Sequence, residues 1–362
     1  MNGPGKPTAV IYCEGNFGKV DGKTANGLIH RCDAYRILSV IDSSKAGTDS
    51  GSDLFGDVND IPVVRNISEA LNLNDPKPEV FIYGLAPANG RLSQRDRDVI
   101  THVISQGMDV VCGLHEFLSE DITFIELATK NDVTIYDVRK PKPNHELRVF
   151  DGSVGMVEAN RIVVMGTDCA IGKRTTATIL DSSLNSQRIK TTLIATGQTG
   201  LMQGARYGVV MDALPSQFCA GELESCITRA AKECELDVIL VEGQGALSHP
   251  AFCTSALILR GSQPNGVILQ HAPKRQYRCD FPSMCVPELA DEILMIESFS
   301  NTKVIGITIN HEYMSDAEVK YAILKYRDTF GLPVLDPLRS SQETLAALVI
   351  DSFSDLKWPL TN

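Results

Sequence analysis

The sequence has few aromatic residues and no long apolar run, and both shortages limit the kind of protein it encodes. Phe, Tyr and Trp make up 6% of its 362 residues, with a single Trp. No stretch stays apolar for the length that a membrane-spanning helix requires. The first residues, MNGPGKPTAVIY, also lack the charged-then-apolar pattern of a signal peptide. We therefore expect a cytoplasmic protein with no membrane partner.

The sequence also has fewer basic than acidic residues, with 34 Lys and Arg against 45 Asp and Glu. The formal net charge is -11 at pH 7, whereas nucleic acids and anionic membranes select basic surfaces. We therefore expect no nucleic-acid partner, and an anionic ligand must be held by donors gathered at one place. With 43% hydrophobic and 22% charged residues, the composition is that of an ordinary globular α/β enzyme.

The ten cysteines form no recognisable metal or disulfide pattern. There is no C-x-x-C pair and no His at zinc-site spacing, so no metal site is expected. Several cysteines lie inside apolar runs, such as Cys112 in DVVCGLH, where a thiol behaves as a small hydrophobic group. Reduced cytoplasmic thiols are the expected state. An intact G-x-G-x-x-G is absent as well, so the Gly-rich turn at 12–30 does not predict dinucleotide binding.

Short apolar runs rich in β-branched residues alternate with helix-like segments along most of the chain. This alternation predicts parallel sheets with helices on both faces. The expected strands of a first domain lie at 8–13, 36–42, 61–64, 79–86, 109–115 and 133–139. Those of a second domain lie at 161–166, 191–197, 237–243, 265–271, 303–310 and 333–336. We predict an α/β protein of two doubly wound, mainly parallel-sheet domains, over 1–142 and 161–362, joined by a linker at 143–160.

Gly and polar residues follow the expected strands of the second domain. They read GTD at 166–168, GQTG at 197–200, EGQG at 242–245, His271, and NH at 310–311. Ligands of doubly wound sheets bind beyond the carboxyl ends of the strands. The functional site is therefore expected at this edge of the second sheet.

The segment RIVVMGTDCAIGKRTT, 161–176, has the features of a phosphate-binding loop. The ordinary loop is G-x-x-x-x-G-K-[ST], whose backbone N–H groups and Lys surround phosphates. Here five residues separate Gly166 from Gly172, Lys173 follows, and a helix beginning near Ile171 would add its dipole. The residues expected to bind a cofactor through its phosphates are Gly166, Thr167, Asp168, Cys169, Ala170, Gly172, Lys173, Arg174, Thr175 and Thr176.

Position 174 departs from the usual loop in a way that bears on the chemistry. Arg174 stands where a Ser or Thr hydroxyl normally holds magnesium, and Thr175 would replace that hydroxyl only if the helix start were shifted. Glu242 ends a strand where an acidic metal ligand of such enzymes would lie. It can serve as a metal ligand, as a general base, or as an acceptor for the amides of the 243–245 turn.

Other candidate residues come from the same strand ends. The expected catalytic residues are Glu242, His271 and Asp212, of which Asp212 closes an apolar run. Those expected to bind substrate are Gln198, Gln244, His249, Arg275 and Arg278, since Arg in particular pairs with carboxylates. Glu222 opens a helix-like segment, where an acidic side chain usually serves the helix dipole. Cys169 is expected to pack rather than to act as a nucleophile.

The motifs GTDCAIGKRTT, ATGQTG, VEGQGALSHP, LQHAPKR and PVLDPLR, with GLHEFL and DVRKP upstream, resemble those of a two-domain family long labelled as a domain of unknown function. The resemblance covers nearly the whole chain and implies a Rossmann-like N-terminal domain and a P-loop NTPase-like C-terminal domain. Some members are described as D-glutamate N-acetyltransferases that use acetyl-CoA. The loop also resembles that of dethiobiotin synthetase, G-T-D-x-x-x-G-K-T. This chain departs from that motif at Arg174, where the motif has Thr.

Two activities are therefore expected as alternatives. The first is acetyl transfer from acetyl-CoA to the amino group of D-glutamate, or of a similar amino acid. The loop would anchor the CoA phosphates, Glu242 or His271 would be the base, and no metal would be needed. The second is an ATP- and magnesium-dependent ligase or kinase of the dethiobiotin synthetase type, using Lys173, Thr175 and Glu242. A nucleotide-dependent regulator or scaffold fits the polar strand ends least well. We also expect a homo-oligomer.

Overall fold

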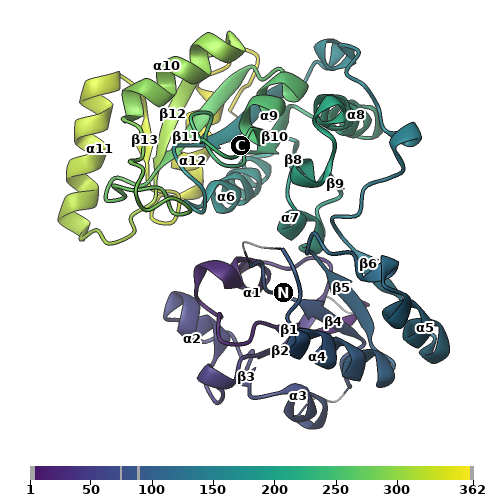
Figure 1. The fold of residues 1–362 in the computed structure, drawn as a ribbon. Coiled ribbons are helices and arrows are strands. Elements are labelled where there is room, and N and C mark those ends of the chain that lie inside the picture. The colour runs from purple at the N-terminus through teal and green to yellow at the C-terminus, as the bar shows by residue number, and fades with distance from the viewer. Residues whose placement is uncertain (1–4, 74–75, 88–89, 359–362) are drawn as a thin grey trace. The chain divides into compact units, whose positions relative to one another are not determined.

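The computed structural model describes residues 5–73, 76–87 and 90–358, and the chain divides into two compact units (Figure 1). Unit 1 comprises residues 1–142 together with 198–206, and unit 2 comprises residues 143–197 and 207–362. Each unit is built around its own sheet. No helix in the described part of the chain is long and apolar enough to cross a membrane.

The sheet of unit 1 has six strands within the described residues, in the order β3-β2-β1-β4-β5-β6, and all neighbours are parallel. This order reverses between β1 and β4, as in a Rossmann sheet. The strands are β1 Thr8–Tyr12, β2 Arg36–Ile41, β3 Val63–Val64, β4 Val80–Tyr83, β5 Asp109–Cys112 and β6 Ile135–Asp137. The helices are α1 Lys23–His30, α2 Ser50–Phe55, α3 Ile67–Leu73, α4 Gln94–Ser105, α5 Ile122–Asn131 and α7 Gln198–Met202.

The sheet of unit 2 has seven strands, again counted over the described residues, in the order β13-β12-β11-β7-β10-β8-β9. All its pairings are parallel. The strands are β7 Asn160–Gly166, β8 Thr191–Ala195, β9 Tyr207–Gly208, β10 Val238–Glu242, β11 Gly266–His271, β12 Val304–Ile309 and β13 Val334–Leu335. The helices are α6 Lys173–Ser186, α8 Ser216–Glu233, α9 Thr254–Ser262, α10 Leu289–Ser300, α11 Asp316–Phe330 and α12 Gln342–Ile350.

Strand β7 is central in this sheet and is buried at every position because helices cover both faces. Its side chains alternate between the faces, as the two-residue period of a strand requires. Ile162 and Val164 belong to a cluster that includes side chains of α6 and α12. Val163 and Met165 belong to a second cluster that includes side chains of α8, α9, α10 and α11. The loop that follows β7 therefore starts from a rigid strand.

The predicted fold class is confirmed, and most expected strands lie within one to three residues of the observed ones. The two-residue strand β9 was not expected. Helix α6 begins at Lys173 rather than near Ile171. The turn before it continues to Gly172, whose φ of +93° lies in the left-handed region.

Two segments depart from the expected domain boundaries. The stretch expected as a linker, 143–160, belongs to unit 2 and is held on α8. The carboxylate of Glu222 accepts from the amide of Arg148 at 2.8 Å, and that of Glu224 accepts from Asp151 and Val154. Glu222 is therefore not a helix cap, since α8 begins at Ser216. The residues 198–206, expected in the second domain, lie in unit 1.

Candidate functional site

The loop between β7 and α6 forms a tight turn at the carboxyl edge of the unit 2 sheet. Ala170 and Gly172 both have positive φ, +50° and +93°, so the backbone reverses before α6 begins. A Cβ at Gly166 would lie 2.8 Å from Cδ of Lys173, so a side chain at this position would displace Lys173. The N-terminus of α6 directs its free amides toward this turn, which is the usual geometry of a phosphate site.

Lys173 closes over the loop that precedes it. Its Nζ donates to the carbonyl oxygen of Asp168 at 2.5 Å, and the residue is 6% exposed. Burial lowers the pKa of Lys173, an effect that Cys169 and Asp168 oppose. A phosphate oxygen has the charge and the acceptor capacity to take the place of that carbonyl. The position of Lys173 is therefore compatible with the predicted phosphate contact.

Arg275, from the loop after β11, clamps the phosphate-binding loop. Its Nε and Nη2 donate to the two carboxylate oxygens of Glu312 at 2.7 and 2.8 Å. Nη1 donates to Asp168 at 3.0 Å and to the carbonyl of Cys169 at 2.6 Å, while Nη2 also donates to Ala170 at 3.3 Å. A guanidinium has five N–H groups, and these contacts use all five. In this conformation Arg275 holds the loop and has no donor left for a substrate carboxylate.

Glu242 and Arg174 face each other beside the loop. Nε of Arg174 lies 3.8 Å from Oε1 of Glu242, and Oε2 of Glu242 accepts from the amide of Thr196 at 3.1 Å. Burial raises the pKa of Glu242, although Arg174 and the amides of Thr196 and Gly197 favour its charged form. Burial also lowers the pKa of Arg174. The pair combines a buried carboxylate with a buried guanidinium at the end of β10.

The residues that would hold magnesium in a P-loop enzyme have other partners here. Arg174 replaces the usual hydroxyl and pairs with the Glu242 carboxylate. The hydroxyl of Thr176 donates to Oε1 of Gln270 at 2.7 Å inside the sheet. Thr175 is the remaining hydroxyl, and it lies on α6 after Arg174. This donor set does not fit a magnesium ion held in the usual way.

His271 ends β11, as expected, and contacts the first part of the loop. Its Nδ1 is 2.9 Å from the hydroxyl of Thr167, and its ring meets Tyr326 edge-on at 5.6 Å. Burial lowers the pKa of His271 to about 4, so the ring is neutral at pH 7. A hydrogen bond between this nitrogen and Thr167, in either direction, fixes the hydroxyl at the start of the loop.

Gln244, His249 and Arg278 lie in the same part of unit 2. The amide of Gln244 donates to the carbonyl of Thr196 at 2.6 Å. Nη2 of Arg278 donates to Ser248, whereas its buried Nη1 has no hydrogen-bond partner in the described structure and lies 3.8 Å from Asp168. Arg275 and Arg278 were both expected to bind substrate. Of these two, Arg278 has a buried Nη atom without a hydrogen-bond partner.

Asp212 and Gln198 are placed differently from each other. Asp212 is exposed, and its neighbour Met211 donates a backbone bond to Thr196, so it lies near the end of β8. Gln198 is 3% exposed in unit 1, where its amide donates to the hydroxyl of Thr24 at 2.7 Å. Gln198 was expected to bind substrate because it follows β8; its side-chain hydrogen bond is to a residue of unit 1.

Thiols, an imidazole and carboxylates also meet at this edge, which the sequence pattern did not predict. Ligand atoms of Asp168, Cys169 and Cys279 lie within 4.8 Å of one another, and so do those of Cys169, His249 and Asp280. Spacing rules detect ligands that are close in the chain, whereas these come from loops far apart in sequence. Nothing in the sequence therefore singled out Cys279 or Asp280.

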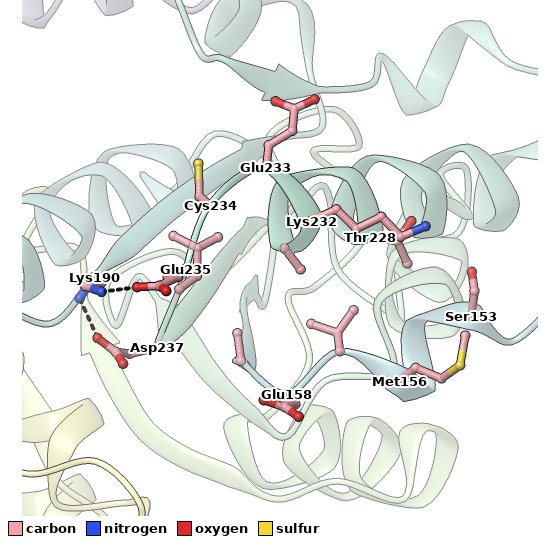
Figure 2. A pocket seen from close by; sticks show the side chains of 14 residues that line it. Ser153, Met156, Glu158, Lys190, Thr228, Lys232, Glu233, Cys234, Glu235 and Asp237 are labelled. Carbon is pink, nitrogen blue, oxygen red and sulfur yellow. Dashed lines mark hydrogen bonds and ion pairs between the residues drawn. The ribbon is translucent and has the colours of Figure 1, made fainter.

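A cavity of about 650 Å³ lies at the other edge of the sheet (Figure 2). Its lining includes Glu158, Lys190 and Asp237, which precede β7, β8 and β10. Figure 2 shows Lys190 between two carboxylates: its Nζ donates to Glu235 and its backbone N–H to Asp237. Because ligands of parallel sheets bind at the carboxyl ends of strands, we place the functional site at the phosphate-binding loop and not in this cavity.

Comparisons with known proteins agree with this architecture. Residues 148–346 match the family described as "Domain of unknown function (DUF1611_C) P-loop domain", and 43–141 match "Domain of unknown function (DUF1611_N) Rossmann-like domain". The crystal structure of a DUF1611 family protein from Anabaena variabilis superposes with a TM-score of 0.88 at 29% identity. That comparison covers 96% of this chain and 100% of the other.

Two curated relatives carry the name D-glutamate N-acetyltransferase. The protein from Tritonibacter scottomollicae is 32% identical over 268 residues, which cover 72% of this chain and 78% of the relative. The protein from Pseudoalteromonas sp. is 31% identical over 288 residues, which cover 78% and 83%. The resemblance drawn from the motifs is thus confirmed, and the chain belongs to the DUF1611 family, with its Rossmann-like and P-loop domains.

Proposed function

We propose that this chain is an N-acetyltransferase that moves the acetyl group of acetyl-CoA to the amino group of D-glutamate. The names of the two curated relatives support this activity. The observation that carries the choice against ATP cleavage is the ion pair of Arg174 and Glu242. It occupies the two positions at which a P-loop enzyme holds magnesium, so the loop is better suited to anchoring phosphates than to breaking them.

The anchoring role follows from the donors around the loop. CoA carries a pyrophosphate and a ribose phosphate, and the amides at the N-terminus of α6 together with Lys173 suit such groups. Arg275 holds the loop carbonyls of Cys169 and Ala170 in place before any ligand arrives. A loop that is ordered in advance loses little entropy when it binds, which favours affinity.

Glu242 is the proposed general base. In the reaction, the amine nitrogen of D-glutamate forms a bond to the acetyl carbon while the carbon–sulfur bond breaks. The amine gives up a proton to the base, and CoA leaves as a thiolate that takes up a proton. A base works best when its pKa approaches the working pH. Burial raises the pKa of Glu242 toward that range, whereas His271, with a pKa of about 4, is a weak base.

The remaining groups have binding or positioning roles. The tetrahedral oxyanion needs N–H donors, which the amides of the 243–245 turn are suited to provide. Arg278, whose Nη1 is buried and has no hydrogen-bond partner in the described part of the chain, is the proposed partner of a substrate carboxylate. His271 positions Thr167. Asp212 is retained as a candidate near the end of β8.

The test is an assay of free thiol. Purified protein is mixed with acetyl-CoA and either D- or L-glutamate, with and without ATP and magnesium. We expect thiol release that requires D-glutamate and proceeds without ATP or magnesium. Absence of release together with ATP turnover would instead support a ligase or kinase and would overturn the proposal.

A further inference from the structure

The loops after three neighbouring strands of unit 2 bring together side chains of the types that bind metal ions. In the order β11-β7-β10, the loop after β11 carries Cys279 and Asp280, the loop after β7 carries Cys169, and the loop after β10 carries His249. Since the strands are parallel, all three loops emerge at the same edge. The ligand atoms fall into two groups that share Cys169, each spanning at most 4.8 Å: one adds Cys279 and the neighbouring Asp168, and the other adds His249 and Asp280.

His249 gives this cluster a feature that packing does not explain. Its side chain is fully buried, stacked on the Phe252 ring at 4.6 Å, and its Nε2 has no hydrogen-bond partner in the described structure. That atom lies 4.0 Å from Oδ2 of Asp280, too far for a hydrogen bond. A buried ring nitrogen without a hydrogen-bond partner, beside the Cys169 thiol and the Asp280 carboxylate, is the arrangement of an imidazole ligand.

We infer that Cys169, His249, Cys279 and Asp280 bind a divalent transition-metal ion of the zinc type. Two sulfurs, one imidazole nitrogen and one carboxylate oxygen are ligands that zinc accepts. Four protein ligands complete a tetrahedral site, so the ion has a structural role: it fixes the 276–286 loop to the phosphate-binding loop. The inference is independent of acetyl transfer.

The surroundings are organised to hold these ligands. Asp168 accepts from the amide of Cys279 at 3.0 Å and pairs with Arg275, which also binds the carbonyl of Cys169. One buried carboxylate thus positions the backbone of both cysteine ligands, as the outer partners of metal ligands commonly do.

Coordination changes one existing contact. Nδ1 of His249 accepts a long hydrogen bond, 3.3 Å, from the amide of Ala251, so the imidazole proton lies on Nε2. Binding of the ion through Nε2 moves that proton to Nδ1 and ends the bond. The loss of one long hydrogen bond is small beside the free energy with which a thiolate-containing site binds zinc.

The test uses the full-length protein, stripped of metal and kept reduced and free of oxygen, and titrates it with Co²⁺. We expect saturation at one ion per chain, with a thiolate-to-cobalt charge-transfer band and the strong visible bands of tetrahedral cobalt. Because two thiolates contribute, Cys169→Ser and Cys279→Ser should each reduce the charge-transfer absorbance by half. Cys285→Ser is the matched control, because Cys285 is exposed on the same loop and outside the cluster, and it should leave the band unchanged.

A measurement on the unmodified chain covers the case in which a variant does not fold. Zinc should protect two of the ten cysteines from alkylation, and peptide mapping should identify them as Cys169 and Cys279. Absence of the cobalt bands, loss of them in Cys285→Ser, or equal alkylation with and without zinc would overturn the inference. A Cys169–Cys279 disulfide that forms in place of metal uptake would overturn it as well.

Discussion

The clamp formed by Arg275 makes a sharp prediction for the stability of unit 2. Arg275→Ala removes the hydrogen-bonded guanidinium of Asp168, a carboxylate that is 0% exposed, and frees two loop carbonyls. Asp168 keeps the Cys279 amide and the more distant Arg278, at 3.8 Å. Breaking a buried ion pair by removing one partner costs about 3–5 kcal/mol. Because Arg278 and the Cys279 amide still face Asp168, we expect the free energy of unfolding of unit 2 to fall by about 3 kcal/mol, the lower end of that range. Trp358 provides the assay: as the only Trp, located after α12, it reports urea unfolding of this unit by its fluorescence.

Two further variants separate a buried-charge effect from a general loss of contacts. Glu312→Gln alters the other carboxylate on the same guanidinium, and because the Glu312 side chain is 22% exposed, this should cost no more than about 1 kcal/mol. Combining Arg275→Ala with Asp168→Asn should recover most of the loss, since the buried carboxylate that lost its guanidinium is then neutral. Equal losses in Arg275→Ala and Glu312→Gln, or no recovery in the double variant, would refute the clamp.

Three other predictions concern the site. Lys173→Ala should raise the Kd for CoA, measured calorimetrically, by a larger factor than it lowers kcat at saturating acetyl-CoA; the opposite ranking would contradict an anchoring loop. Glu242→Gln should lower kcat by roughly 10²–10⁴-fold while CoA still binds, and near-normal turnover would rule it out as the base. The pKa of His271 falls from 6.5 unfolded to about 4 folded, so the neutral ring stabilises the fold above pH 6.5 and that stability is lost as the pH falls toward 4. At pH 4 the loss is roughly 3 kcal/mol, and Trp358 fluorescence should show it in the wild type but not in His271→Asn.

The parts of the structure predicted from sequence are those with a local signal. Apolar β-branched runs placed the strands, and the order of Gly166, Gly172 and Lys173 placed the phosphate-binding loop. Residues at strand ends, such as Glu242 and His271, were expected at one edge because parallel strands end together. These features depend on periodicity and spacing over short stretches of chain.

What the sequence did not reveal depends on contacts between distant segments. Arg275 was expected to bind substrate, yet its five donors are taken by the loop and by Glu312, which only the folded geometry shows. Gln198 follows β8, but its helix lies in unit 1. The meeting of Cys169 with Cys279 has no pattern in sequence, because it arises from the neighbouring positions of β7 and β11 in the sheet.

The most direct test of the central claim is the identity of the product. The protein is incubated with acetyl-CoA labelled with ¹³C in the acetyl group and D-glutamate labelled with ¹⁵N, without ATP and without added magnesium. Mass spectrometry should find N-acetylglutamate carrying both labels, formed in proportion to the free thiol released. Thiol release without the doubly labelled product, or the product only when ATP and magnesium are present, would contradict acetyl transfer by an anchoring loop.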